Sequence, residues 1–242
     1  MEIRVLASNG VRVALEALAP AFERGDGHKL AVEFGVGAGL KRRIEAGDAF
    51  DLAILASAAI DDLARQGRVD ALSRTAIARS GVGIGIRKGA PRPDIGTADA
   101  LKRTLLAARS ITWAKEGVGG VYFAGLLERM GIAGEIKPKA ILAASGEEVG
   151  ERVAAGKAEL GVILVNELMA APGVELLGPL PAELQNHTVF HAGVGVGSKD
   201  SAAAKALIEF LTTPSAGAVF RAKGQEPAAK PAFRGSDLSG LT

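Results

Sequence analysis

The sequence predicts an α/β protein of two lobes, joined by two crossover strands, with a cleft between the lobes. Short apolar segments alternate with helical patterns along the chain, which is typical of a largely parallel sheet. Two glycine-rich apolar segments, 82–86 and 194–196, flank the middle of the chain and are the expected crossings. We therefore expect one lobe from residues 1–82 and 192–242, and the other lobe from residues 83–191.

Each element is predicted from its own local pattern. Strands are expected where apolar residues form short runs, at 3–7, 30–34, 52–55, 82–86, 110–113, 140–142, 160–165 and 189–196. Helices are expected where apolar residues recur with helical spacing, at 11–23, 40–46, 60–66, 98–107, 121–130, 147–155, 202–211 and 216–222. A proline-containing linker at 91–93 separates two series of elements. We expect the tail after Pro227 to be a surface strap or a frayed end.

One stretch of sequence is echoed later in the chain. Residues 43–55 (RIEAGDAFDLAIL) resemble residues 152–164 (RVAAGKAELGVIL), and each combines a helix end, a glycine, a polar turn and an apolar strand. The alternative is that the likeness carries no information, because glycine ends many helices and any helix–glycine–strand connection has a similar sequence. If the echo is real, each half of the chain holds an equivalent α/β unit, and a binding site is expected between the two.

Composition and charge exclude several classes of function. The 242 residues include 48% hydrophobic ones, 29 Lys and Arg against 27 Asp and Glu, and no cysteine. The basic residues are scattered, so we expect no nucleic-acid partner. No apolar run approaches the roughly 18 residues of a spanning helix, so we expect no membrane insertion. Without cysteine there are no disulfides and no thiolate metal sites. The N-terminus has no leader pattern, so we expect the periplasm if a leader was removed and the cytoplasm if the chain is complete.

Candidate binding residues follow the predicted strands, because ligands of α/β sheets bind at the carboxyl ends of strands beside helix N-termini. Ser8 and Asn9 follow the first strand, and Arg12 lies in the first turn of the next helix. Backbone amides at a helix start favour an anion. Ser8 or Asn9 would equally serve as an N-cap without any ligand, and Arg12 as a solvated surface side chain.

The second strand is followed by a glycine-rich turn, Val36, Gly37, Ala38 and Gly39. It looks like a dinucleotide-binding fingerprint, but the third glycine comes one residue early and no Gly-Lys-Ser/Thr follows. We interpret the turn as a backbone nest through which an anion approaches closely, with plain turn flexibility as the alternative.

Further candidates stand in four later turns. Ser57 is a cap or a ligand contact, and Asn166 ends the strand of the second echo unit. Gly119, Gly120 and Tyr122 open a helix that would face the first lobe across the cleft. The turn at 145–148 has the pattern of an ordinary cap and acidic first turn, which we interpret as structural. His187 and His191 lack a third ligand, so we expect no metal, and we expect no other cofactor.

These turns also carry a family resemblance. The chain resembles molybdate-type ABC-transporter substrate-binding proteins over nearly its whole length, through residues 6–10 (LASNG), 43–55, 78–84 (ARSGVGI), 178–185 (GPLPAELQ), 202–211 and 223–227 (KGQEP). The resemblance implies the type II periplasmic-binding-protein fold, with a ligand in the cleft. By position it implies contacts from Ser8, the 36–39 turn, Ser57, the 119–122 turn and Asn166.

Two functions from different classes fit that resemblance. The first is a binding protein that closes on a small anion, either an oxyanion or an organic carboxylate, for ABC-type uptake by a permease. The second is an isomerase, because aconitate isomerase is similar to the same family; here Ser8, Arg12 and backbone amides would hold a polycarboxylate. The turns show no obvious base, which favours binding. Val36 and Gly119 stand where hydroxyl residues are expected in oxyanion binders, so molybdate fits less well than a carboxylate. We expect a monomer.

Overall fold

The computed structural model describes residues 2–228. Its strands are β1 (Glu2–Ser8), β2 (Lys29–Gly35), β3 (Leu52–Ala56), β4 (Thr75–Arg87), β5 (Ile111–Ala114), β6 (Ala140–Ala143), β7 (Leu160–Leu164), β8 (Val174–Pro179), β9 (His187–Val194) and β10 (Glu226–Pro227). Its α-helices are α1 (Arg12–Asp26), α2 (Gly37–Glu45), α3 (Ser57–Arg65), α4 (Ala98–Ala107), α5 (Val118–Arg129), α6 (Ala133–Ile136), α7 (Gly146–Ala154), α8 (Val165–Ala170), α9 (Ser201–Leu211) and α10 (Pro214–Ala222). None of these helices is long and apolar enough to span a bilayer.

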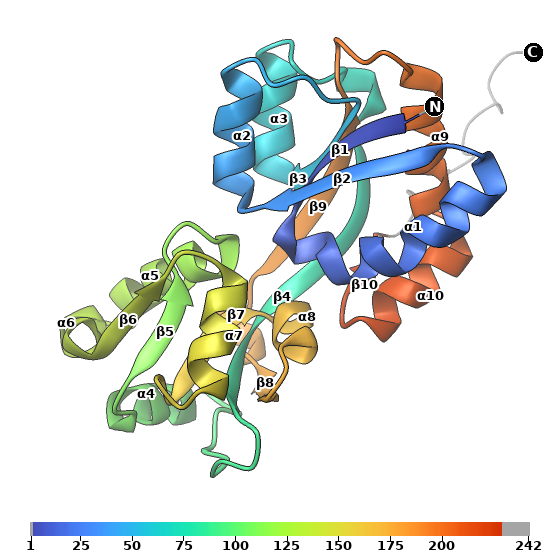
Figure 1. Ribbon diagram of the computed structural model, residues 1–242. Coiled ribbons are helices and arrows are strands. Elements are labelled where there is room, and N and C mark those ends of the chain that lie inside the picture. Colours follow the sequence, from blue (N-terminus) through green and yellow to red (C-terminus); the bar gives the residue numbers. More distant parts are fainter. Residues whose placement is uncertain (1, 229–242) are drawn as a thin grey trace, which may run out of the picture.

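The elements form two α/β lobes, as the sequence predicts (Figure 1). The strand order is β2-β1-β3-β9-β4-β7-β5-β6, with β8 and β10 also paired to β4. The first half of β4 pairs with β9, and its second half pairs with β7 and β8. The long strand β4 therefore connects the two sheets, and helices from both ends of the chain, α1, α9 and α10, share one lobe.

The second crossing lies earlier in the chain than the sequence indicates. Val194 is not at the crossing, because it pairs with Leu52 at the far end of β9. The chain instead passes between the sheets just before β9, where His187 pairs with Gly81. The division into lobes at 82/83 and 191/192 stays a prediction.

The two lobes contain equivalent units, which supports the sequence echo. In one lobe β1 lies between β2 and β3, and all three strands are parallel. In the other lobe β5 lies between β6 and β7, again all parallel. The echoed segments are α2 to β3 and α7 to β7. The carboxyl ends of both parallel sets face the region between the lobes (Figure 1).

The glycines that thin β4 make room for α8. A Cβ atom at Gly83 would lie 2.9 Å from a methyl group of Val165, and one at Gly85 would lie 2.5 Å from a methyl group of Leu168. Real side chains do not approach so closely, so α8 lies directly on the second half of β4 only because these positions are glycine. This contact places the start of α8 at the inner side of the second lobe.

Several details differ from the predicted elements. Val165 begins α8, although the apolar run predicts that the strand extends through it. The predicted elements do not include β8, and the predicted strand at 82–86 covers only the second half of β4. The expectation that the tail after Pro227 is a surface strap or a frayed end falls mainly on residues 229–242, which lie outside the described residues. The core is built mainly from Ala, Val, Leu and Ile, in keeping with the 4% aromatic content of the sequence.

Candidate functional site

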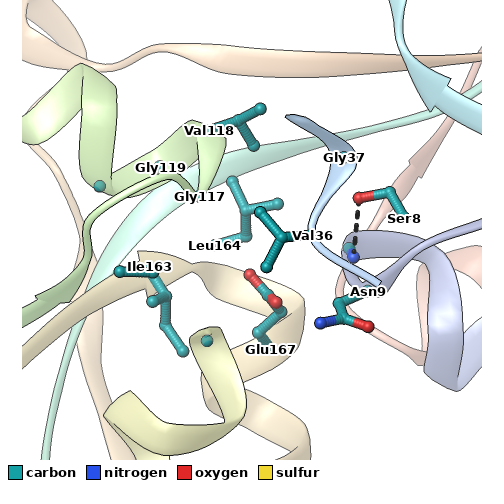
Figure 2. A pocket seen from close by; sticks show the side chains of 14 residues that line it. Ser8, Asn9, Val36, Gly37, Gly117, Val118, Gly119, Ile163, Leu164 and Glu167 are labelled. Atoms are coloured by element: carbon teal, nitrogen blue, oxygen red, sulfur yellow. Dashed lines mark hydrogen bonds between the residues drawn. The ribbon is translucent and has the colours of Figure 1, made fainter. Parts of the chain in front are cut away.

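A cavity opens where the turns of the two lobes meet (Figure 2). The first lobe contributes residues after β1 and β2, and the second contributes residues after β5 and β7 and at the start of α7. The lining residues are Ser8, Asn9, Gly10, Val36, Gly37, Ala114, Gly117, Val118, Gly119, Gly120, Gly146, Ile163, Leu164 and Glu167. Its free volume is about 30 Å³, room for about two water molecules. A larger ligand therefore needs the lobes to move apart before it enters.

Two helices of opposite lobes begin at this cavity without side-chain caps. The N-cap of α2 is Val36 and the N-cap of α5 is Gly117, and within the described residues no side chain caps either of them. By contrast, Ser145 caps α7 by accepting a hydrogen bond of 3.2 Å from the Glu148 amide. The first amides of a helix have no partner within the helix and carry its partial positive charge. The starts of α2 and α5 can therefore donate to an anion from both sides.

Ser8 caps a short helix and also lines the cavity. Its Oγ accepts a hydrogen bond of 3.3 Å from the Gly10 amide, which caps the short helix at Asn9–Val11. The same side chain lines the cavity and is 7% exposed (Figure 2). Capping does not exclude ligand contact, because the hydroxyl proton remains free to donate.

Arg12 lies behind the lining. Its Nη2 donates to Asn9 Oδ1 at 3.1 Å, and its guanidinium lies 5.0 Å from the centre of the Phe34 ring. Its buried Nε has no hydrogen-bond partner among the described residues. Arg12 thus supplies positive charge near the cavity while it holds Asn9 in place.

Glu167 is the one carboxyl group among the described residues that line the cavity. It extends from α8 toward Val36 of the other lobe, as Figure 2 shows. Burial raises the pKa of Glu167 to about 7, while the Leu164 amide and the charge of Arg12 act in the opposite direction. A group with this pKa gains and loses a proton near neutral pH.

The sequence predicts a ligand contact at Asn166 and does not single out its neighbour Glu167. The structure places Asn166 beneath the cavity, where it is 1% exposed. Its Nδ2 donates to the Gly10 carbonyl at 2.8 Å, and the same carbonyl accepts from Gln225 Nε2 at 3.1 Å. Asn166 therefore joins the second lobe to the first.

The remaining predicted contacts divide into two groups. Ser8, Asn9, Val36, Gly37, Gly119 and Gly120 line the cavity. Arg12, Ala38, Gly39, Ser57, Tyr122 and Asn166 lie outside that lining. Tyr122 directs its hydroxyl to the Leu184 carbonyl at 2.7 Å, within its own lobe. As ligand contacts, all of these residues stay predictions.

An ion pair bridges the lobes on the surface. Arg42 of α2 donates to Glu116, which precedes α5, at a distance of 2.8 Å. This bridge joins the segments that carry the two uncapped helix starts. In residues 2–228 there is no cluster of three or more His, Asp or Glu side chains that could hold a metal ion.

The family follows from a match over most of the chain. The sequence profile of the bacterial extracellular solute-binding proteins matches residues 3–226. The chain belongs to this family. It is a solute-binding protein, and its cleft between two lobes has the position expected of a ligand site.

Individual relatives bind or convert different molecules, by their names. Aconitate isomerase of a Pseudomonas species is 31% identical over 231 residues, which cover 93% of this chain and 87% of the relative. The molybdate-binding protein of Azotobacter vinelandii is 26% identical, over 92% of this chain and 89% of the relative. The solved sulfate-binding protein SubI of Mycobacterium tuberculosis has a TM-score of 0.78 at 19% identity, covering 96% of this chain and 88% of that one. The structural neighbours confirm the type II periplasmic-binding-protein fold.

Proposed function

We propose that this solute-binding protein closes on a small organic carboxylate in the cavity between its lobes. The observation that carries the proposal is the meeting of two uncapped helix starts, α2 and α5, from opposite lobes. Each offers main-chain amides to an anion, and each belongs to a different lobe, so an anion between them would hold the lobes together.

The lining favours a carboxylate over a tetrahedral metal oxyanion. Val36 and Gly119 line the cavity without a hydroxyl group, and Ser8 is the one hydroxyl residue among the described lining residues. A missing hydrogen bond to a buried charged group costs about 1.5–3 kcal/mol, or about tenfold or more in affinity. Glu167 does not discriminate between these ligands, because its ionised form repels any anion and its protonated form can donate a hydrogen bond to either kind of oxygen.

Calorimetry with a panel of anions tests the proposal. The panel is molybdate, tungstate, sulfate, citrate, cis-aconitate and trans-aconitate, and we expect the organic carboxylates to bind tightest. A ligand at about 100 times its Kd should stabilise the protein by about 2.7 kcal/mol. Nanomolar binding of molybdate with no binding of the carboxylates would contradict the proposal.

A matched pair of serine variants tests the location. Ser8→Ala removes a hydroxyl from the cavity lining, whereas Ser201→Ala removes one from the exposed surface of α9. We expect Ser8→Ala to weaken carboxylate binding by about tenfold, since it removes one hydrogen bond to a charged group. Ser201→Ala should bind as the wild type does, and equal loss in both variants would place the ligand elsewhere.

Isomerisation of the bound ligand is the second candidate function. It is favoured by the 31% identity to an aconitate isomerase and by Glu167, a carboxyl group in the cavity.

If the protein instead serves uptake only, we propose that it works in the periplasm and delivers its ligand to an ABC-type permease, in keeping with its membership of the extracellular solute-binding family. Turnover of aconitate would favour the enzyme, and binding without turnover would favour uptake.

A further inference from the structure

We propose that Glu167 is the acid–base group of the cleft, which moves a proton between two carbon atoms of a bound unsaturated polycarboxylate. The inference rests on the proposed binding of a carboxylate and adds the group that would act on it. It concerns a residue that sequence analysis left out of the site.

Packing fixes the place of Glu167. The helix α8 lies on β4 because Gly83 and Gly85 leave space for it, and this brings Glu167 to the inner surface of the second lobe. A Cβ atom at Gly146 would lie 2.5 Å from Glu167 Oε1. The glycine at the first turn of α7 therefore leaves space for the carboxyl group, which extends into the cavity (Figure 2).

The surroundings suit a group that both takes and returns a proton. The apolar side chains of Val36 and Leu164 lie beside the carboxyl group (Figure 2), and Glu167 is partly buried. Burial raises the pKa of Glu167 to about 7, while the Leu164 amide and the Arg12 charge lower it. No other charged side chain is found among the described lining residues. Both protonation states are therefore populated at neutral pH, which is the condition for efficient general acid–base catalysis.

The uncapped helix starts supply the electrostatic help that proton abstraction needs. Removing a proton from a carbon atom leaves negative charge on the ligand, which spreads into its carboxylate and double bond. Amides at the starts of α2 and α5 can donate to the carboxylate oxygens that receive this charge. Donors fixed in advance stabilise such charge without reorganisation.

The reaction balances without a further reactant. The Glu167 carboxylate takes a proton from the methylene carbon, breaking that C–H bond, and the electron pair forms a delocalised allylic carbanion. The protonated Glu167 then returns the proton to the far carbon of the allylic unit. One C–H bond breaks, one forms, and the double bond moves by one carbon. An unsaturated tricarboxylate such as aconitate has the required methylene group beside a double bond.

A structural role for Glu167 makes a different prediction. The Leu164 amide at the start of α8 also interacts with the Glu167 carboxyl group and lowers its pKa, which is one half of a helix cap. Glutamine keeps the length and the acceptor oxygen of this cap but cannot act as a base. Glu167→Gln therefore separates the two roles.

The experiment follows cis- and trans-aconitate by proton NMR in deuterated buffer, beside calorimetry of both ligands. The wild type should interconvert the isomers and exchange methylene protons for deuterium, with kcat/KM rising as pH increases through about 7. Glu167→Gln should bind within about tenfold of the wild type but react about 10²–10⁴-fold more slowly. Glu147→Gln on exposed α7 surface is the control and should react as the wild type does. Glu167→Asp retains a carboxyl group and should keep partial exchange, which also covers a failure of the glutamine variant to fold.

Each contrary result has a separate meaning. Binding of aconitate by the wild type without exchange or conversion overturns the acid–base role and leaves carboxylate binding intact. Unchanged turnover in Glu167→Gln overturns the assignment of this residue. Failure of the wild type to bind either isomer overturns the carboxylate proposal, and this inference with it.

Discussion

Replacing Gly120 by alanine tests whether the start of α5 has to lie against the end of β5. A Cβ atom at Gly120 would stand 1.9 Å from the Ala114 carbonyl oxygen, a main-chain atom that no side-chain rotation can move. Gly125, on the same helix, has the Arg129 side chain at 3.5 Å as its nearest neighbour, an ordinary contact. Both substitutions gain helix propensity, up to about 1 kcal/mol. The difference in stability between the two variants therefore measures the cost of overpacking at position 120.

Overpacking of this kind costs about 1–3 kcal/mol. For a chain of this size 1 kcal/mol corresponds to about 2–4 °C in Tm. Gly120→Ala should thus melt about 2–12 °C below Gly125→Ala, in thermal scans and urea titrations of both variants. Since Gly119 and Gly120 open the helix, the shift should also weaken anion binding. A Gly120→Ala protein as stable as Gly125→Ala would refute the reasoning.

Three further predictions concern charged groups. Because the pKa of Glu167 in the folded protein is raised to about 7, the free energy of unfolding should fall as pH rises from about 4.5 to 7. In urea titrations Glu167→Gln should therefore be more stable than the wild type at pH 8, and this difference in stability should vanish below pH 4.5. Burial raises the pKa of Asp51, but hydrogen bonds from the Arg4 and Lys199 amides and the Ser198 hydroxyl lower it overall. Asp51→Asn should therefore be less stable than the wild type at neutral pH and equally stable in acid. Circular dichroism during an acid titration of both proteins would show this. The exposed Arg42–Glu116 pair should contribute no more than about 1 kcal/mol in a double-mutant cycle, and less at high salt.

The fold was largely predictable because its pattern is local and repeated. Apolar runs and helical spacing locate strands and helices without knowledge of their partners, and the echo of 43–55 in 152–164 indicates equivalent units. The local sequence pattern does not show where the chain passes from one lobe to the other. The crossing near His187 depends on pairing with Gly81, more than a hundred residues away in the chain.

The site was harder to predict because its glycines and valine have low helix propensity, and because the sequence does not tell in which direction each side chain points. Glycine disfavours helix, so the predicted start of α5 is residue 121, although the helix begins at Val118 and its first amides lie at the cavity. The β-branched Val165 extends the predicted strand by one residue, which hides the start of α8. Neighbours on a helix point in different directions, so Asn166 turns to the Gly10 carbonyl while Glu167 enters the cavity.

The uncapped starts of α2 and α5 have an evolutionary consequence. Their donors are main-chain amides, which survive almost any substitution that preserves the helices. Affinity for negative charge is thus inherited with the backbone, while the residue types at positions such as 36, 119 and 167 remain free to vary. A lineage on this scaffold can exchange one anion for another, or acquire chemistry, by a few replacements around a permanent cradle. Relatives named for molybdate, sulfate and aconitate are what such a history would leave.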